Sequence, residues 1–216
     1  MTKFVENSVQ LFCVRNRQLI EAKLCLATEK HLQNFEQNWQ PVLLNTEEED
    51  RYWNWLQKKR IYGSRLGAES YAVECEEMTQ GLMLMETLGH RSWFKPRQRI
   101  VYIHSVATAP WNRSAIQEPP KYRFVGSVLL EFARYRSIEL GYQGLVGLHA
   151  LPEAEEFYRR LGMIECGSDP DKDGLIYFEW YHPQDYLSNE LEEAINWEDE
   201  SNTVEWLESE EVDNEL

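Results

Sequence analysis

The stretch that decides the fold reads YIHSVATAPWNR at residues 102–113, KYRFVG at 121–126 and SVLLEF directly after it. The first part is rich in β-branched and aromatic residues, which favours a strand over residues 99–109. A loop rich in proline and polar residues follows. Gly126 then opens a run whose apolar residues recur at helical spacing, and Gly141 suits a helix C-cap. The order is therefore strand, loop and long helix.

Strands and helices also alternate on both sides of this centre. Alternating or continuously apolar runs predict strands at 18–26, 68–75, 80–87, 144–149, 163–166 and 174–181. Capping residues predict helices from Thr28 to about Trp39 with Pro41 as the stop, from Thr46 with Glu49 as a capping box to Arg60, and from Pro152 to Leu161. Such alternation after a β-heavy start predicts one mixed sheet.

The start of the long helix is a candidate phosphate site. The first turn of a helix presents unpaired backbone N–H groups and the positive end of the helix dipole, which suits a pyrophosphate. Lys121 and Arg123 precede this turn. The expected N–H donors are Val125, Gly126, Ser127 and Val128. A glycine before a helix is also common in a plain tight turn, so the position alone leaves both readings open.

The order and spacing of these segments resemble the GNAT superfamily of acyltransferases. That family carries a strand ending in a V-x-P-like stretch, a Q/R-x-x-G-x-G/A loop, a long helix, a strand and a helix with an F-Y-x-x-x-G-like ending. Here the later strand reads GLVGLHA (144–150) and the last helix reads AEEFYRRLGM (154–163). The resemblance covers about residues 100–166. It implies an α/β (α+β) domain over residues 1–186, with a mixed, mostly antiparallel sheet flanked by helices and a splayed strand pair.

The resemblance also implies a reaction. An acetyl or other short acyl group would pass from acetyl-CoA, or another acyl-CoA, directly to a small-molecule or peptide amine in a ternary complex. The pantetheine arm would pair with the backbone near Val106 and Thr108. Tyr158, in the F-Y pair, would be the acid that protonates the leaving thiolate.

The base is less closely specified by the resemblance. His104 stands near the place where many relatives carry a carboxylate, and a histidine titrates near neutrality. His149 and Glu86 are the alternatives. The five histidines are scattered along the chain without metal-ligand spacing, so we expect no metal in the site.

Some residues depart from the family pattern. In one register Lys121 stands at the Q/R position and Phe124 replaces the first glycine. In the other register Arg123 fills the Q/R position and Val128 replaces the last glycine. Leu151 occupies the place of a frequent asparagine. These departures keep open a second function, in which a non-catalytic module of the same fold binds CoA or a protein partner without turnover.

The charge of the chain is concentrated in its last thirty residues. The net charge is −15, and residues 187–216 hold 12 acidic and no basic residues, so the remainder has 37 − 12 = 25 acids against 22 bases. An acidic chain repels phosphate, and we expect no nucleic-acid partner. The composition of the tail predicts disorder. Trp197 and Trp206 in this tail are candidates for contact with a protein partner.

Composition also bears on the compartment. The four cysteines fit neither a disulfide framework nor a zinc knuckle, and the first ten residues lack the layout of a signal peptide. No apolar run approaches the ~20 residues that cross a bilayer. We therefore expect a cytoplasmic protein with reduced thiols and no membrane association.

Overall fold

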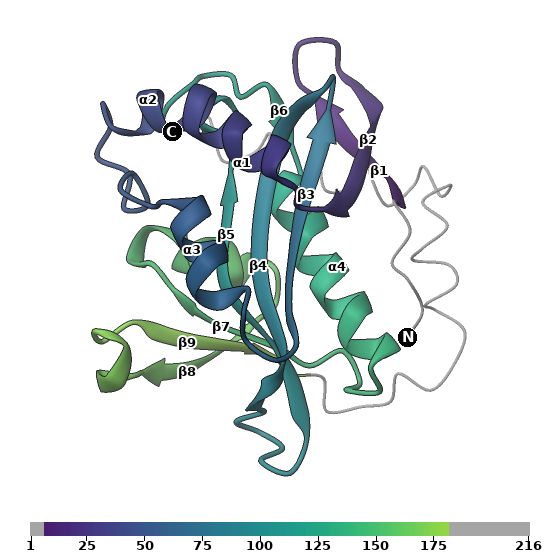
Figure 1. Ribbon diagram of the computed structural model, residues 1–216, viewed down its shortest axis with the longest axis vertical. Helices are drawn as coiled ribbons and strands as arrows, with labels where there is room; N and C mark the ends of the chain where they lie inside the picture. The colour runs from purple at the N-terminus through teal and green to yellow at the C-terminus, as the bar shows by residue number, and fades with distance from the viewer. Residues whose placement is uncertain (1–6, 182–216) are drawn as a thin grey trace, which may run out of the picture. The chain divides into compact units, whose positions relative to one another are not determined.

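The computed structural model describes residues 7–181, which are built around a nine-stranded sheet (Figure 1). Its strands are β1 (Asn7–Cys13), β2 (Gln18–Leu26), β3 (Ala68–Cys75), β4 (Met78–Arg91), β5 (Arg99–Thr108), β6 (Tyr122–Arg123), β7 (Val146–Ala150), β8 (Ile164–Ser168) and β9 (Ile176–Trp180). They lie in the order β6-β1-β2-β3-β4-β5-β7-β9-β8. β5 and β7 are parallel and the other neighbours are antiparallel, which confirms the predicted mixed, mostly antiparallel sheet.

Helices cover both faces of this sheet. They are α1 (Glu29–Asn34), the π-helical turn η1 (Phe35–Trp39), α2 (Gln40–Leu43), α3 (Trp55–Tyr62), α4 (Val125–Glu139) and α5 (Glu155–Arg160). Three 3₁₀ turns complete the set: η2 (Pro110–Asn112), η3 (Pro152–Ala154) and η4 (Pro170–Lys172). The long helix α4 begins one residue before Gly126, close to its predicted start.

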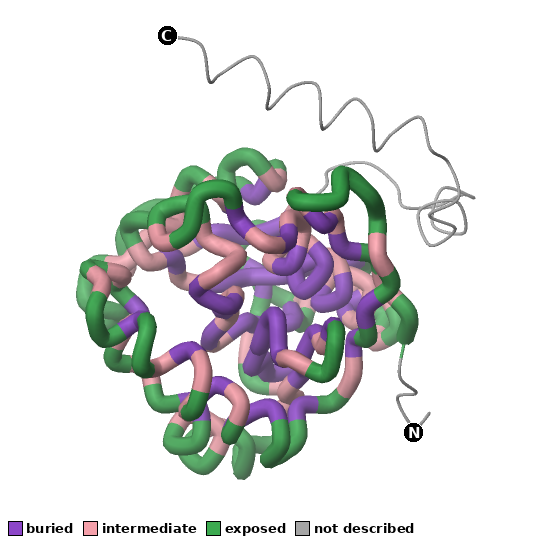
Figure 2. The backbone as a smooth tube through the Cα atoms, turned by 90° about the horizontal axis from the view of Figure 1, so that it is seen from above, coloured by how far each residue is buried: buried purple, intermediate pink, exposed green. Residues whose placement is uncertain are grey.

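The alternation of side chains along β4 divides the core in two. Met83 and Met85 belong to the apolar cluster that includes the buried face of α4. Leu82 and Leu84 belong to a second cluster with the helices from α1 to α3. Because successive strand residues point to opposite faces, one strand supplies both clusters. Figure 2 shows the buried segments inside and the exposed ones around them.

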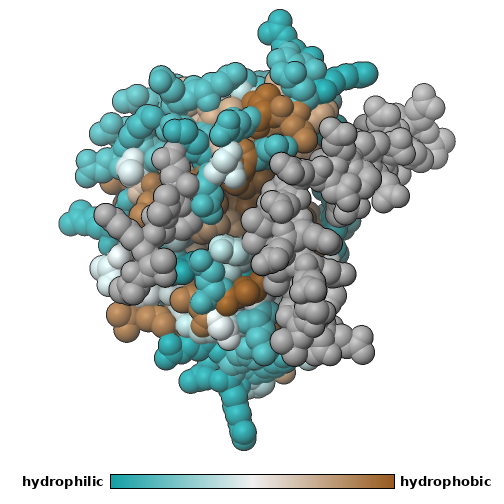
Figure 3. All heavy atoms as spheres, turned by 90° about the vertical axis from the view of Figure 1, so that its right-hand side faces the viewer, coloured by the Kyte–Doolittle hydropathy of each residue, from teal (hydrophilic) through white to brown (hydrophobic). Residues whose placement is uncertain are grey.

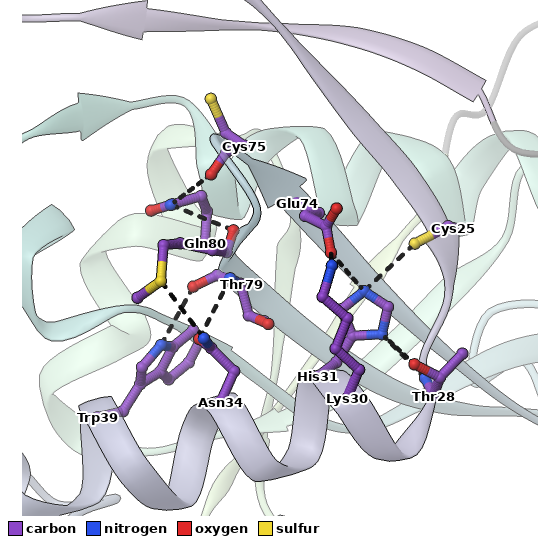
Figure 4. Close-up of polar contacts among 11 residues, drawn as sticks. Cys25, Thr28, Lys30, His31, Asn34, Trp39, Glu74, Cys75, Thr79 and Gln80 are labelled. Atoms are coloured by element: carbon purple, nitrogen blue, oxygen red, sulfur yellow. Dashed lines mark hydrogen bonds and ion pairs between the residues drawn. The ribbon is translucent and has the colours of Figure 1, made fainter.

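The first helix begins where its cap was predicted. Thr28 is the N-cap, and its backbone N–H donates to Nδ1 of His31 at 2.9 Å (Figure 4). Pro41 does not end the helical segment, which runs on through α2. The π-turn η1 ends two residues before Pro41, and the N–H of Gln40 donates to the carbonyl of Phe35, five residues back. This wider turn accommodates a proline that a regular helix interior would exclude.

The helix predicted from Thr46 is wrong in its first half. α3 begins only at Trp55, where Asn54 caps it and accepts the N–H of Gln57 at 2.7 Å. Residues 46–53 form turns and irregular backbone instead. Glu48 and Asp50 each accept a hydrogen bond of 2.7 Å from Arg113. This distant ion-pair network outweighs the local capping signal.

Two strands, β1 and β6, were not predicted from the sequence. β1 pairs with β2 over seven residues, and its other edge pairs with β6, where Phe12 lies opposite Arg123. None of the helices within residues 7–181 is long and apolar enough to span a bilayer. On the face shown in Figure 3, hydrophobic side chains gather between larger hydrophilic areas.

Candidate active site

The parallel strands β5 and β7 separate in the middle of the sheet. They pair at Val101 with Val146, Tyr102 with Gly147 and Ile103 with Leu148, and the pairing then stops. β5 continues to Thr108 along β4, and in the described part of the chain no other strand pairs with this edge. Val106 lies on the separated stretch. The splayed pair that the resemblance implied is therefore present, and it leaves a strand edge open to a ligand.

The first turn of α4 presents free backbone donors. Within residues 7–181, no acceptor pairs with the N–H groups of Val125, Gly126 and Ser127. Val128 differs from our expectation, because its N–H donates to the carbonyl of Phe124 at 2.9 Å. Three amides, rather than four, therefore form a seat for an anion at the positive end of the helix.

Helix α5 packs against this first turn. A Cβ placed on Gly126 would lie 3.0 Å from Cζ of Phe157, so the aromatic ring covers the glycine closely. Tyr158 is buried, and its ring contacts that of Phe178 with centroids 5.8 Å apart. Burial alone raises the pKa of the Tyr158 phenol, because no charged neighbour or hydrogen bond contributes. The buried phenol therefore holds its proton more tightly than a tyrosine in water.

These features can be compared with known structures. No protein-family model matches the chain. No curated protein matches it either. The PaiA N-acetyltransferase of Thermoplasma acidophilum, solved in complex with coenzyme A, is similar in structure with a TM-score of 0.51 and 12% identity, over 76% of this chain and 100% of that one. The chain has the GNAT fold.

Two further structures are similar at lower scores. The N-acetyltransferase YlbP of Bacillus subtilis, in complex with coenzyme A, has a TM-score of 0.49 at 15% identity. The match covers 76% of this chain and 99% of the YlbP chain. A GNAT-family acetyltransferase of Listeria monocytogenes has a TM-score of 0.49 at 12% identity, with 80% and 99% covered. At such identities the likeness concerns the fold alone.

The residues proposed as the base of a GNAT-fold enzyme come together beside the splayed strands. Nε2 of His104 lies 2.9 Å from Oε2 of Glu86, and Nε2 of His90 lies 3.5 Å from the same oxygen. Nη1 of Arg65 is also 3.5 Å from it. His149 is adjacent through Tyr102, whose ring lies 4.8 Å from that of His104.

His149 belongs to a second chain of hydrogen bonds. Nδ1 of His149 lies 2.8 Å from the hydroxyl of Tyr102, and its Nε2 lies 3.0 Å from Oδ2 of Asp169. The Tyr102 ring stacks on His90 with centroids 4.1 Å apart. The structure therefore places all three alternatives for the base in one network, with His90 and Asp169 as additional members.

Burial sets the protonation of the central pair. It lowers the pKa of His104, although the hydrogen bond and charge of Glu86 oppose this effect. Burial acts against ionisation of Glu86, but the hydrogen bond from His104 and the nearby positive charge of Arg65 contribute to an overall lowering of the pKa of the carboxyl. At neutral pH the pair is therefore a neutral imidazole that donates Nε2–H to a carboxylate, and its lone pair is on Nδ1.

Two irregularities of the sheet create this cluster. Leu84 and Met85 lie opposite Ser105 and Ile103, so His104 is an extra residue in β5. From Glu86 to His90, β4 advances by four residues, whereas the paired stretch of β5, from Tyr102 to Ile100, advances by two. The N–H and the hydroxyl of Thr87 both donate to the carbonyl of Gly67, at 2.9 and 3.0 Å, and this anchors the bulge.

Sequence reasoning missed His90 because a bulge leaves no local pattern. In a regular strand Glu86 and His90 would share a face but lie about 13 Å apart. The bulge brings their side-chain atoms to 3.5 Å. The even spacing of the two residues was the one available signal, and it required knowledge of the pairing in β5.

Other predicted site residues have partners within the protein. Nζ of Lys121 forms an ion pair of 2.9 Å with Glu76. Arg123 is half-buried in β6 opposite Phe12. The carbonyl of Thr108 accepts two hydrogen bonds from Arg113, at 3.0 and 2.8 Å, so it is not free as we expected.

Phe124 takes a conformation that glycine favours. It is the N-cap of α4, with φ of 72° and ψ of 2° in the left-handed region. This agrees with the register in which Phe124 stands where the GNAT pattern has its first glycine. Its ring turns toward Phe12 of β1, with centroids 6.4 Å apart. Leu151 precedes η3 and offers no amide side chain.

Proposed function

We propose that this protein transfers an acetyl or another short acyl group from acyl-CoA directly to an amine in a ternary complex. The observation that carries the proposal is the open edge of β5 beside three free amides at the start of α4. The Thermoplasma acidophilum N-acetyltransferase with the same fold was solved with coenzyme A, which supports this choice of co-substrate.

The residues present fit such a co-substrate. The N–H groups of Val125, Gly126 and Ser127 would hold the pyrophosphate, since three donors and the helix dipole favour negative charge there. The outer edge of β5 near Val106 would pair with the amides of the pantetheine arm, as a strand edge does with an extended peptide. The bound group supplies an acyl thioester, which is activated toward amines.

The protein supplies the proton transfers. An acceptor amine is protonated at neutral pH and must lose a proton before it attacks. His104, held by Glu86, would take this proton at Nδ1, directly or through water. The Tyr158 hydroxyl has no partner within residues 7–181 and would donate a proton to the leaving sulfur.

The charges around the network favour a cationic acceptor. Glu86 and Asp169 are the carboxylates that approach the histidines of this network. Carboxylates beside an open edge attract a protonated amine and concentrate it near the base. We therefore propose a small-molecule or peptide amine as acceptor.

Calorimetry and turnover test the proposal in sequence. Acetyl-CoA should bind with one-to-one stoichiometry, and turnover should be measured across a panel of amines. Tyr158→Phe should lower kcat by about 10²-fold or more while the affinity for acetyl-CoA stays the same. Tyr71→Phe, a buried tyrosine of β3, is the matched control. Absence of acetyl-CoA binding would overturn the function, and an unchanged kcat would remove Tyr158 from the mechanism.

A second function is favoured by two features of the predicted phosphate loop. Lys121 is neutralised by Glu76, and Phe124 replaces a glycine of the loop. A module that binds CoA or a protein without turnover would tolerate both features. Saturable CoA binding without transfer to any amine in the panel would favour this alternative.

The acidic tail proposed as a partner contact lies outside the described residues, and loss of a captured partner on deletion of residues 187–216 would test it.

A further inference from the structure

Three donor side chains converge at the edge of the splayed strands. The imidazole nitrogens of His90 and His104 and a carboxylate oxygen of Glu86 all lie within 4.8 Å of one another. We propose that Glu86, His90 and His104 form a binding site for a divalent transition-metal ion, with Zn²⁺ as the best fit. The scattered histidines of the sequence predicted no metal, and only the two sheet irregularities bring these residues together.

The two separations that involve Glu86 are close to those expected for a shared ion. Nε2 of His104 and Nε2 of His90 lie 2.9 and 3.5 Å from Oε2 of Glu86. Ligand atoms that share a zinc ion at about 2.1 Å lie about 2.9–3.4 Å apart, for octahedral to tetrahedral angles. The ion would therefore replace the proton that His104 now donates to Glu86, with small side-chain movements.

The ligands are held in place before an ion arrives. Tyr62 stacks on the His104 ring with centroids 4.6 Å apart, and Tyr102 stacks on the His90 ring at 4.1 Å. Glu86 is only 7% exposed. The bulge that brings Glu86 near His90 is anchored through Thr87. Such positioning reduces the entropy lost on binding.

The donor set selects the class of metal. Two imidazoles and one carboxylate suit Zn²⁺ and its first-row neighbours, whereas Mg²⁺ and Ca²⁺ prefer oxygen ligands throughout. Three protein ligands leave a fourth position open to water or another ligand. The His90 side chain is 30% exposed, which gives an ion a route from solvent.

Arg65 opposes a cation in this position. Its Nη1 lies 3.5 Å from Glu86, but its side chain is 48% exposed and can turn toward solvent. Removal of this charge should therefore tighten metal binding. This gives a test whose direction differs from that of losing a ligand.

The site goes beyond the proposed acyl transfer and shares two residues with it. The ion would occupy Nε2 of His104 and the carboxylate of Glu86, which together hold the proposed base. Metal binding and proton acceptance therefore exclude one another, and Zn²⁺ should inhibit transfer. Binding of the metal is measured without acyl-CoA or amine, so it succeeds or fails independently of the enzymatic proposal.

The test uses the full chain with Zn²⁺ or Co²⁺ alone. Calorimetry should show one Zn²⁺ site, and Co²⁺ should give the visible d–d absorption of a low-coordinate nitrogen and oxygen site. His90→Ala should lower Zn²⁺ affinity by about tenfold or more, and Arg65→Gln should raise it. His90→Gln serves as a second ligand variant, and circular dichroism confirms that each variant is folded.

Cys25→Ser is the matched control. Cys25 and His31 lie 3.6 Å apart and offer a competing pair of ligands away from the proposed site. This variant should leave both affinity and the Co²⁺ spectrum unchanged. Binding that survives in both His90 variants, or a Co²⁺ spectrum that changes in Cys25→Ser, would overturn the assignment. Absence of any one-to-one binding would overturn it equally.

Discussion

The ring of Phe157 covers Gly126 so closely that a Cβ at this glycine would lie 3.0 Å from its Cζ atom. Gly126→Leu should therefore push the ring aside or fill the space before the free amides. We expect the affinity for acetyl-CoA to fall by about tenfold or more, measured by calorimetry. Gly126→Ala should have a smaller effect. If crowding is the cause, Phe157→Ala should restore part of the affinity in the Gly126→Leu background, whereas no recovery would exclude it.

The backbone conformation at position 124 should favour glycine over alanine. Its φ of 72° is costly for any residue with a Cβ, and both replacements lose the same ring contact with Phe12. Phe124→Gly should therefore be more stable than Phe124→Ala by about 1 kcal/mol, as measured by urea unfolding. Ser127, within the first turn of α4, is the control, and there alanine should be more stable than glycine by about 1 kcal/mol. The same order at both positions would contradict the left-handed cap.

Arg113 should be a major contributor to stability. It is half-buried and donates to Glu48, Asp50 and the carbonyl of Thr108. Arg113→Met leaves these acceptors unpaired, and we expect a loss of about 3–5 kcal/mol in the free energy of unfolding. Arg51→Met breaks the ion pair with the exposed Glu47 and should cost at most about 0.5 kcal/mol. Equal effects of the two changes would refute a structural role for Arg113.

His31 should make the fold sensitive to mild acid. Burial lowers its pKa below 6.5 in the folded state, although Glu74 opposes this effect. The unfolded chain therefore binds a proton first, and stability is lost as pH falls below about 6.5. His31→Gln keeps an acceptor for the N–H of Thr28 and cannot titrate. Between about pH 7.5 and pH 5, wild type should lose more stability than His31→Gln in urea unfolding, and parallel curves would reject the effect.

The parts of the fold predicted from the sequence are those with strong local signals. The alternation in QLIEAKLCL and AESYAVEC predicts β2 and β3 with the bounds found in the structure. The early strand β1 is held by its pairing with β2, and the two-residue β6 by its pairing with β1, which no local pattern indicates. The wrong helix start at Thr46 has the same origin, because the partner of Glu48 and Asp50 is 63 or more residues away.

Several residues of the site could be predicted from the sequence, but the distances between them could not. His104, Glu86 and His149 were each candidates, but their separation depends on extra residues in β4 and β5. His90 reaches Glu86 because of a bulge, and Arg113 forms long-range ion pairs. Such distances follow from the register of distant strands, and a single strand's sequence does not encode it.

Only three residue pairs join β5 to β7, and the strands on either side of this parallel pairing are antiparallel to their neighbours. The sheet is thus divided into two parts joined by this short pairing, and the smaller part, made of β7, β9 and β8, carries His149, which contacts Tyr102 of β5. A ligand that bridges the gap would connect the two parts of the sheet where β5 and β7 no longer pair. Binding of such a ligand should slow hydrogen exchange at the outer amides of β5.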